Sequence, residues 1–109
     1  GMKQRLGLAR VLASQAQLLL MDEPFAALDF LTRAELQAEL LHLQRRMPRT
    51  IVLVTHQLDE ALLLGDSVTV MHSDSSLRTF DLSGLPQPRD PESDALRRLR
   101  REITDECRL

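Results

Sequence analysis

The segment Leu18–Asp22 and the residue after it constrain the fold most strongly. Four consecutive apolar residues end in two adjacent acids, Asp22 and Glu23, and a Pro-containing loop leads from them to a third acid, Asp29. A continuous apolar run of this length is typical of a parallel strand that is buried on both faces. Open α/β sheets bind their ligands at the carboxyl ends of such strands, so the acids are expected at a binding edge.

This acidic pair has an ordinary interpretation and a functional one. A strand can end in an acidic turn without any function, and for the two acids alone that interpretation is the better one. At a nucleotide-hydrolysing site, however, Asp22 can hold a hydrated Mg²⁺ while Glu23 orients and deprotonates the attacking water. The sequence around the pair favours the second interpretation.

The rest of the chain alternates between helical and extended patterns. Asp29 is a plausible N-cap for a helix that Pro48 stops, and Gly65 signals the end of a shorter helix. Repeated strand-helix-strand alternation favours an α/β fold with a parallel sheet and covering helices. The expected helices are residues 2–14, 29–47, 58–64 and 94–106, and the expected strands are residues 18–21, 51–54, 68–71 and an edge strand at 77–82.

Three segments together resemble the C-terminal half of an ATP-binding-cassette (ABC) ATPase subunit. Residues 1–5 resemble the tail of the signature motif, residues 18–23 the Walker B strand with its catalytic Glu, and residues 27–29 the D-loop. His56, which follows the apolar run IVLVT, resembles the switch histidine. The resemblance implies a partial P-loop NTPase (RecA-like) fold, with a small, mainly parallel sheet, flanking helices and no P-loop strand. It also implies that residues 1–83 belong to the ATPase domain and residues 84–109 form a connector and a C-terminal helix.

The resemblance implies a composite site for ATP and Mg²⁺, formed by two subunits. Asp22 would hold Mg²⁺ through water, Glu23 would be the general base, and His56 would contact the γ-phosphate. Asp29 would link the two subunits. A lone histidine after a strand is more often structural, but the acids one element earlier favour the catalytic role for His56. The signature end would contribute Gly1 to the partner's nucleotide, with Gln4 and Arg5 supporting it.

The family's phosphate-binding loop, GxxxxGK[ST], does not occur in these 109 residues, whose only lysine is Lys3. The chain alone is therefore expected to bind ATP weakly and not to hydrolyse it. Gly1 followed by Met2 fits either the last signature glycine or the remnant of a cleaved tag. These two origins are compatible.

Composition narrows the function classes. The net charge of −2 and the absence of Trp and Tyr give no case for nucleic-acid binding. The apolar runs are far shorter than the ~20 residues that cross a bilayer, and no signal peptide is recognisable. A single cysteine, Cys107, suits a reducing cytosol.

The tail has two features of its own. Residues 84–93 are rich in Pro and polar residues and are expected to be an extended connector, followed by a helix with four arginines within residues 97–101. These arginines suggest a membrane or RNA surface, but a solvated helix face with i,i+4 acid pairs is the better interpretation. The connector also resembles that of importer ATPases for nitrate, sulfonates, taurine and bicarbonate, through Leu85, Pro86, Pro88, Arg89 and Asp90.

The function expected from the resemblance is that of an importer ATPase subunit at the inner face of a bacterial membrane. It would work as a homodimer with a second ATPase subunit, and it would reach the membrane only through a permease. Two alternatives remain open: a non-catalytic remnant or interaction module, and a non-transport ABC ATPase. The fragment is also expected to self-associate, to exchange elements between copies, or to pair strands 51–54 and 68–71 directly, because these strands would have apolar, unpaired edges.

Overall fold

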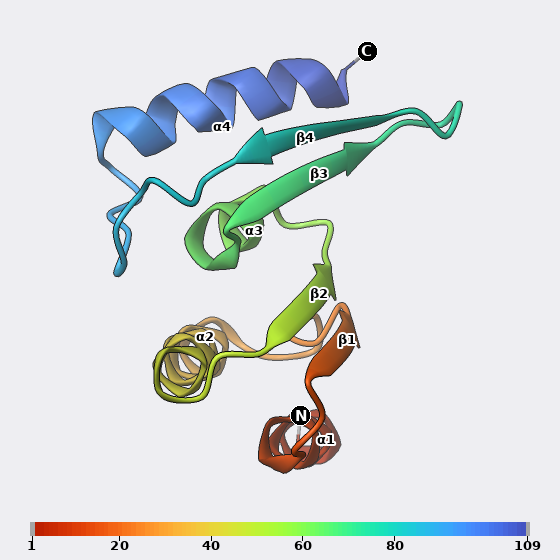
Figure 1. Cartoon of the computed structure of the whole chain (residues 1–109), viewed down its shortest axis with the longest axis vertical. Coiled ribbons are helices and arrows are strands. Elements are labelled where there is room, and N and C mark those ends of the chain that lie inside the picture. The colour runs from red at the N-terminus through yellow and green to blue at the C-terminus, as the bar shows by residue number, and fades with distance from the viewer. Residues whose placement is uncertain (1, 109) are drawn as a thin grey trace. The chain divides into compact units, whose positions relative to one another are not determined.

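The computed structural model describes residues 2–108, except for the side chains of residues 2–5 and 8 (Figure 1). Two compact units divide the chain, Gly1–His56 and Gln57–Leu109, and each is described by itself. The sequence predicted a boundary near residue 83, between the ATPase domain and the C-terminal connector and helix. That boundary is a different division from these two units, and it stays a prediction. Within the described residues, no helix combines the length and the apolar character needed to span a membrane.

The first unit contains four elements in the predicted order. They are α1 (Met2–Ala13), β1 (Leu18–Asp22), α2 (Phe30–Arg46) and β2 (Thr50–Val54). The carboxylate of Asp29 accepts a hydrogen bond from the Thr32 N–H at 2.8 Å, which confirms the predicted N-cap. Helix α2 ends two residues before Pro48, as expected from the steric restriction on the residue that precedes a proline.

Strands β1 and β2 pair in parallel, and Leu20 lies opposite Val52. The prediction that β1 is buried on both faces is wrong for the described structure. Leu19 and Met21 are buried, whereas the exposed fraction of Leu20 is 72% and that of Val52 is 49%. Successive side chains of a strand point to opposite faces, so the described part of the unit buries only one face of this two-stranded sheet.

The second unit consists of α3 (Leu58–Leu64), β3 (Ser67–Met71), β4 (Leu77–Asp81) and α4 (Asp94–Cys107). Strands β3 and β4 form an antiparallel hairpin, and α4 runs along it (Figure 1). The prediction of a mainly parallel sheet is therefore only partly right, because one two-stranded sheet is parallel and the other is antiparallel. A tight turn links β3 to β4, and a turn of this length can join only antiparallel strands.

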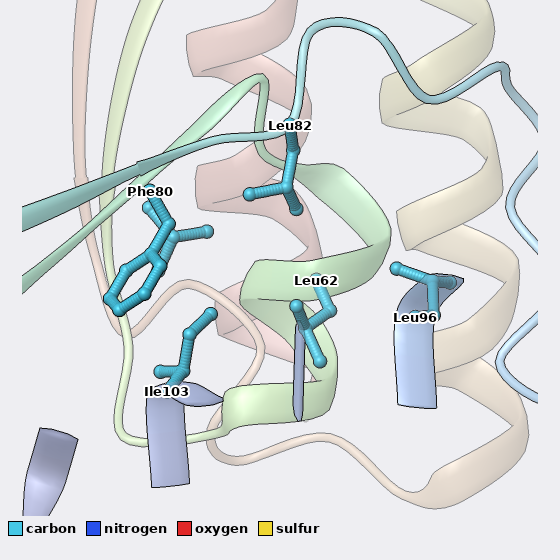
Figure 2. Close-up of a cluster of buried hydrophobic side chains, with 6 residues drawn as sticks. Leu62, Phe80, Leu82, Leu96 and Ile103 are labelled. Atoms are coloured by element: carbon cyan, nitrogen blue, oxygen red, sulfur yellow. The ribbon is translucent and has the colours of Figure 1, made fainter. Parts of the chain in front are cut away.

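One hydrophobic core holds the second unit together (Figure 2). Helix α3, the hairpin and α4 all contribute to it. Leu99 of α4 packs against the core from its edge. Together with Leu96 and Ile103, it forms the apolar face of α4 that contacts the core. The buried members are Leu62, Val68, Phe80, Leu82, Leu96 and Ile103.

Arg89 makes the predicted connector a packed segment of this unit. Its guanidinium is buried and donates hydrogen bonds to the carbonyl oxygens of Leu62 (2.9 Å) and Leu82 (3.0 Å), and also to that of Gly65. Burial lowers the pKa of Arg89, and the carboxylate of Asp66 partly opposes this shift. A cation here also complements the carbonyl end of α3.

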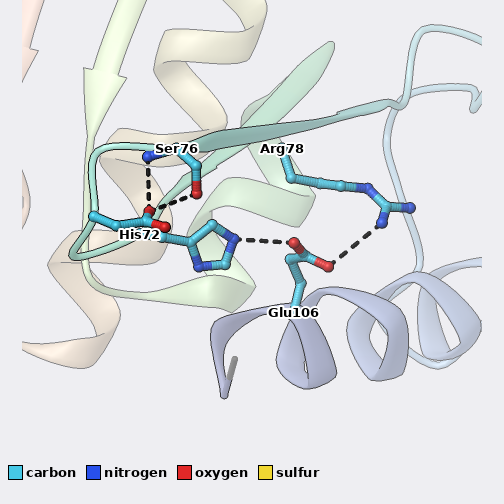
Figure 3. Close-up of polar contacts among 5 residues, drawn as sticks. His72, Ser76, Arg78 and Glu106 are labelled. Atoms are coloured by element: carbon cyan, nitrogen blue, oxygen red, sulfur yellow. Dashed lines mark hydrogen bonds and ion pairs between the residues drawn. The ribbon is translucent and has the colours of Figure 1, made fainter.

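A second polar cluster ties α4 to the hairpin (Figure 3). The carboxylate of Glu106 hydrogen-bonds to His72 Nε2 at 2.9 Å and lies 3.4 Å from an Arg78 nitrogen. Arg78 also lies over the Phe80 ring, 5.0 Å from its centroid. Because the side chains of His72 and Glu106 are only 15% and 13% exposed, His72 has a structural role in this unit.

Candidate functional site

The parallel register places the predicted site residues of β1 and β2 at one edge of the sheet. Asp22 lies opposite Val54, and the Glu23 N–H donates to the Val54 carbonyl oxygen at 2.8 Å. The pairing therefore continues to the residue before the Pro-containing loop. Glu23 and His56 consequently emerge at the same end of the sheet, as the sequence predicted.

Glu23 and His56 are in direct contact. The backbone N–H of His56 donates to Glu23 Oε1 at 2.8 Å, and His56 Nε2 lies 3.5 Å from the same oxygen. The carboxylate is 26% exposed and the imidazole side chain is 92% exposed. Glu23 thus fixes the backbone where β2 ends, while the imidazole remains available to a bound molecule.

The backbone of Glu23 is in the left-handed region, with φ of 49°. This conformation costs a non-glycine residue of the order of 1 kcal/mol. Two hydrogen bonds hold it, one from the Glu23 N–H and one to its carboxylate. The strained turn directs the carboxylate toward the end of β2, where a ligand at this edge of the sheet would be within its reach.

Asp22, the predicted Mg²⁺ residue, is the exposed last residue of β1. Among residues 2–108, no group of three or more histidine, cysteine or acidic side chains could hold a metal ion. Mg²⁺ is commonly held by one or two carboxylates together with substrate phosphates and water. The single exposed carboxylate of Asp22, directly before Glu23 in the chain, fits that arrangement.

The predicted D-loop leads directly into α2. The carboxylate of Asp29 caps this helix, and Arg33 donates to the Leu28 carbonyl oxygen at 3.1 Å. Phe25 and Leu28 are both buried, so the loop is anchored on either side of its two exposed alanines. Asp29 therefore has a structural role within the chain, and its predicted role between subunits stays a prediction.

The signature end lies partly outside the described residues. Gly1 lies outside the described residues, and Gln4 and Arg5 belong to α1 with side chains outside the described part. At the other end of α1, Arg49 donates to the Ser14 carbonyl oxygen at 2.8 Å. Arg49 and Gln44 also exchange hydrogen bonds through the Arg49 backbone.

Sequence reasoning missed Arg49. No motif or periodicity marks it, because its partner Ser14 is 35 residues away in the chain. Its position directly before an apolar strand is the one available signal. A long basic side chain directly before β2 lies close to the residues that precede the parallel strand β1, which include Ser14.

Comparison with known proteins gives a consistent set of relatives. The chain is 52% identical over 79 residues to the glycine betaine/carnitine transport ATP-binding protein GbuA of Listeria monocytogenes, a match covering 72% of this chain and 20% of the relative. It is 47% identical over 92 residues to the nitrate transport protein NasD of Klebsiella oxytoca, covering 83% and 35% respectively.

The match to the aliphatic sulfonates import ATP-binding protein SsuB 2 of Pseudomonas syringae pv. tomato is longer. It has 48% identity over 107 residues and covers 97% of this chain and 46% of that relative. No protein-family model matches the chain.

The chain spans less than half the length of each of these curated relatives. Over the matched length, the sequence identity is high enough to establish common ancestry. The relatives are ABC transporter ATP-binding subunits of the importer type. The chain is therefore homologous to a segment of the ATP-binding subunits of ABC-type importers.

Proposed function

We propose that this chain is the part of an importer ATPase that activates water for attack on the γ-phosphate of ATP. The contact between Glu23 and His56 carries the proposal. It brings an acid and an imidazole together at the carboxyl ends of two parallel strands, where α/β sheets bind ligands. Both residues come from the motifs that resemble Walker B and the switch histidine.

The side chains divide the chemistry between them. Glu23 takes a proton from the attacking water, and general-base catalysis of this kind contributes about 10²- to 10⁴-fold to a rate. His56, exposed beside it, donates a hydrogen bond to the γ-phosphate. Asp22 would hold Mg²⁺ through water, and the metal ion, when bound, would neutralise charge on the β- and γ-phosphates.

The intact system would contain two such subunits and a membrane permease. Gly1, with Gln4 and Arg5 behind it, would meet the nucleotide of the partner subunit, and Asp29 would lie near the boundary between the subunits. A helix N-terminus is suited to this contact because its free N–H groups bind anions. We place the subunit at the inner face of the cell membrane, reaching the bilayer through the permease.

The solute is proposed to be a small oxyanion. The relative that imports aliphatic sulfonates matches 97% of the chain, a length that must include most of the connector and α4. The relative that transports nitrate matches 83%. Arg89, part of the connector that resembles this importer subgroup, is also buried and holds the connector against α3 and the residue that follows β4.

A chimera tests the catalytic proposal. The chain replaces its matched segment in the sulfonate-import relative, and Mg·ATP hydrolysis is measured before and after Glu23→Gln and His56→Ala. Circular dichroism and a nucleotide-binding assay establish that each chimera is folded. Asp66→Asn, an exposed acid after α3, is the matched control for loss of one negative charge.

The chimera should hydrolyse ATP, Glu23→Gln should reduce the rate by about 10²-fold or more, and Asp66→Asn should leave it within about twofold. A folded chimera that binds ATP and hydrolyses it equally well with and without the Glu23 carboxylate would refute the proposal.

A further inference from the structure

Helix α4 presents a fixed outer face that the proposed ATPase chemistry does not use. Leu96 and Ile103 are buried in the core of the second unit, and both point from α4 into it (Figure 2). Ser93 caps the helix by accepting a hydrogen bond from the Leu96 N–H. The core and the cap together fix which side of α4 faces outward.

The outward side holds a shallow depression of about 430 Å³. Four of its six lining residues are arginines and one is an acid, so the lining carries a formal charge of +3 although the whole chain carries −2. Concentrated positive charge on a weakly acidic chain favours an anionic ligand at this place. The lining residues are Arg97, Arg100, Arg101, Thr104, Asp105 and Arg108.

Acidic neighbours only partly neutralise these arginines. Arg97 pairs with Glu92 at 2.6 Å, and Arg100 pairs with Asp59 at 2.7 Å. The i,i+4 pairs expected within the helix do not form among the described residues, and neither Arg101 nor Arg108 has an ion pair there. The acids that do pair with these arginines, Glu92 and Asp59, lie outside α4.

The pair between Arg97 and Glu92 can give way to a stronger ligand. The side chains of Arg97 and Glu92 are 61% and 72% exposed, and water screens an ion pair at such a position so that it contributes little to stability. A phosphate group offers a guanidinium two parallel charge-assisted hydrogen bonds. An anion with several phosphates can therefore replace exposed carboxylates at little cost.

The spacing of the arginines indicates more than one phosphate. At ~1.5 Å per residue, Arg97 and Arg101 are about 6 Å apart along the helix axis, and Arg108 is about 10 Å further. The Thr104 hydroxyl lies between them and can donate another hydrogen bond.

We propose that the outer face of α4 binds a soluble anion with two or more linked phosphate groups, through Arg97, Arg101 and Arg108. This site lies in the second unit and does not depend on the proposed catalytic residues of the first. It is thus a separate binding function that the family homology does not supply.

The test is calorimetric titration of the chain with sodium tripolyphosphate at low ionic strength, compared with orthophosphate. Arg101→Gln removes a lining arginine, and Arg98→Gln, also exposed on α4 but outside the depression, removes the same charge as a matched control. Circular dichroism shows that both variants keep their helix content. Vesicles of anionic phosphatidylglycerol and neutral phosphatidylcholine form a second arm.

Tripolyphosphate should bind saturably and more tightly than orthophosphate. Arg101→Gln should weaken it about fivefold or more, and Arg98→Gln less than about twofold. Three results would overturn the proposal: no saturable binding, equal losses in the two variants, or binding to anionic vesicles without binding to tripolyphosphate. The last result would mean that a membrane surface, not a soluble polyphosphate, is the ligand.

Discussion

Replacing Arg89 with alanine should destabilise the second unit by about 3 kcal/mol. Two of the hydrogen bonds of Arg89, to the carbonyl oxygens of Leu62 and Leu82, are buried. Each buried carbonyl left without a donor costs ~1 to 3 kcal/mol, so the two together cost about 3 kcal/mol. A unit of this length has a total stability of only about 5 kcal/mol, at ~0.1 kcal/mol per residue.

Arg89→Lys provides an intermediate case. A lysine keeps the positive charge near the end of α3 but lacks the planar fork that reaches both carbonyl oxygens at once. It should recover about half of the lost free energy. Arg98→Ala removes an exposed arginine from the same unit and should change its stability by less than ~0.5 kcal/mol.

Hydrogen exchange followed by mass spectrometry is the suitable assay, because it reports the opening free energy of peptides from β3, β4 and α4 separately from the first unit. The reasoning is refuted if Arg89→Ala lowers these opening free energies by less than ~1 kcal/mol, or by no more than Arg98→Ala does. Either result would mean that water satisfies the carbonyl oxygens when the guanidinium is removed.

Three further predictions concern individual hydrogen bonds. Glu23→Gln keeps an acceptor for the His56 N–H and should melt near the wild type, whereas Glu23→Ala should lose about 1 kcal/mol; equal melting temperatures would contradict this. Arg49→Ala should increase hydrogen exchange at the end of α1, and unchanged exchange there would show that the contact with α1 is dispensable. Hydrogen bonds from Ser76 hold the pKa of Asp74 below its ordinary value of 3.8, so the turn keeps this stabilisation above that pH and loses it as the pH falls through the lower folded-state pKa. In Ser76→Ala, carboxyl titration by NMR should find the pKa of Asp74 closer to 3.8, and an unchanged value would rule out the side-chain hydrogen bond as its cause.

Much of the candidate site could be predicted because its signals are local in the sequence. Apolar runs, an N-cap residue and a proline stop determine where elements begin and end, and the structure confirms them within one or two residues for β1, α2 and β2. Parallel pairing then brings Glu23 and His56 to one edge. The sequence could not reveal the left-handed backbone of Glu23 or its hydrogen bond to the His56 N–H, since both depend on the geometry of the turn.

The sequence by itself determined the order of helices and strands, the acids at the end of β1 and the motifs that relate the chain to importer ATPases. These properties depend on residues that are adjacent or one helical turn apart. Only the tertiary structure decided that Arg89 is buried and that His72 binds Glu106. The physical reason is that Arg89 meets Leu62 across 27 positions of the chain and His72 meets Glu106 across 34. Burial depends on which distant elements pack together.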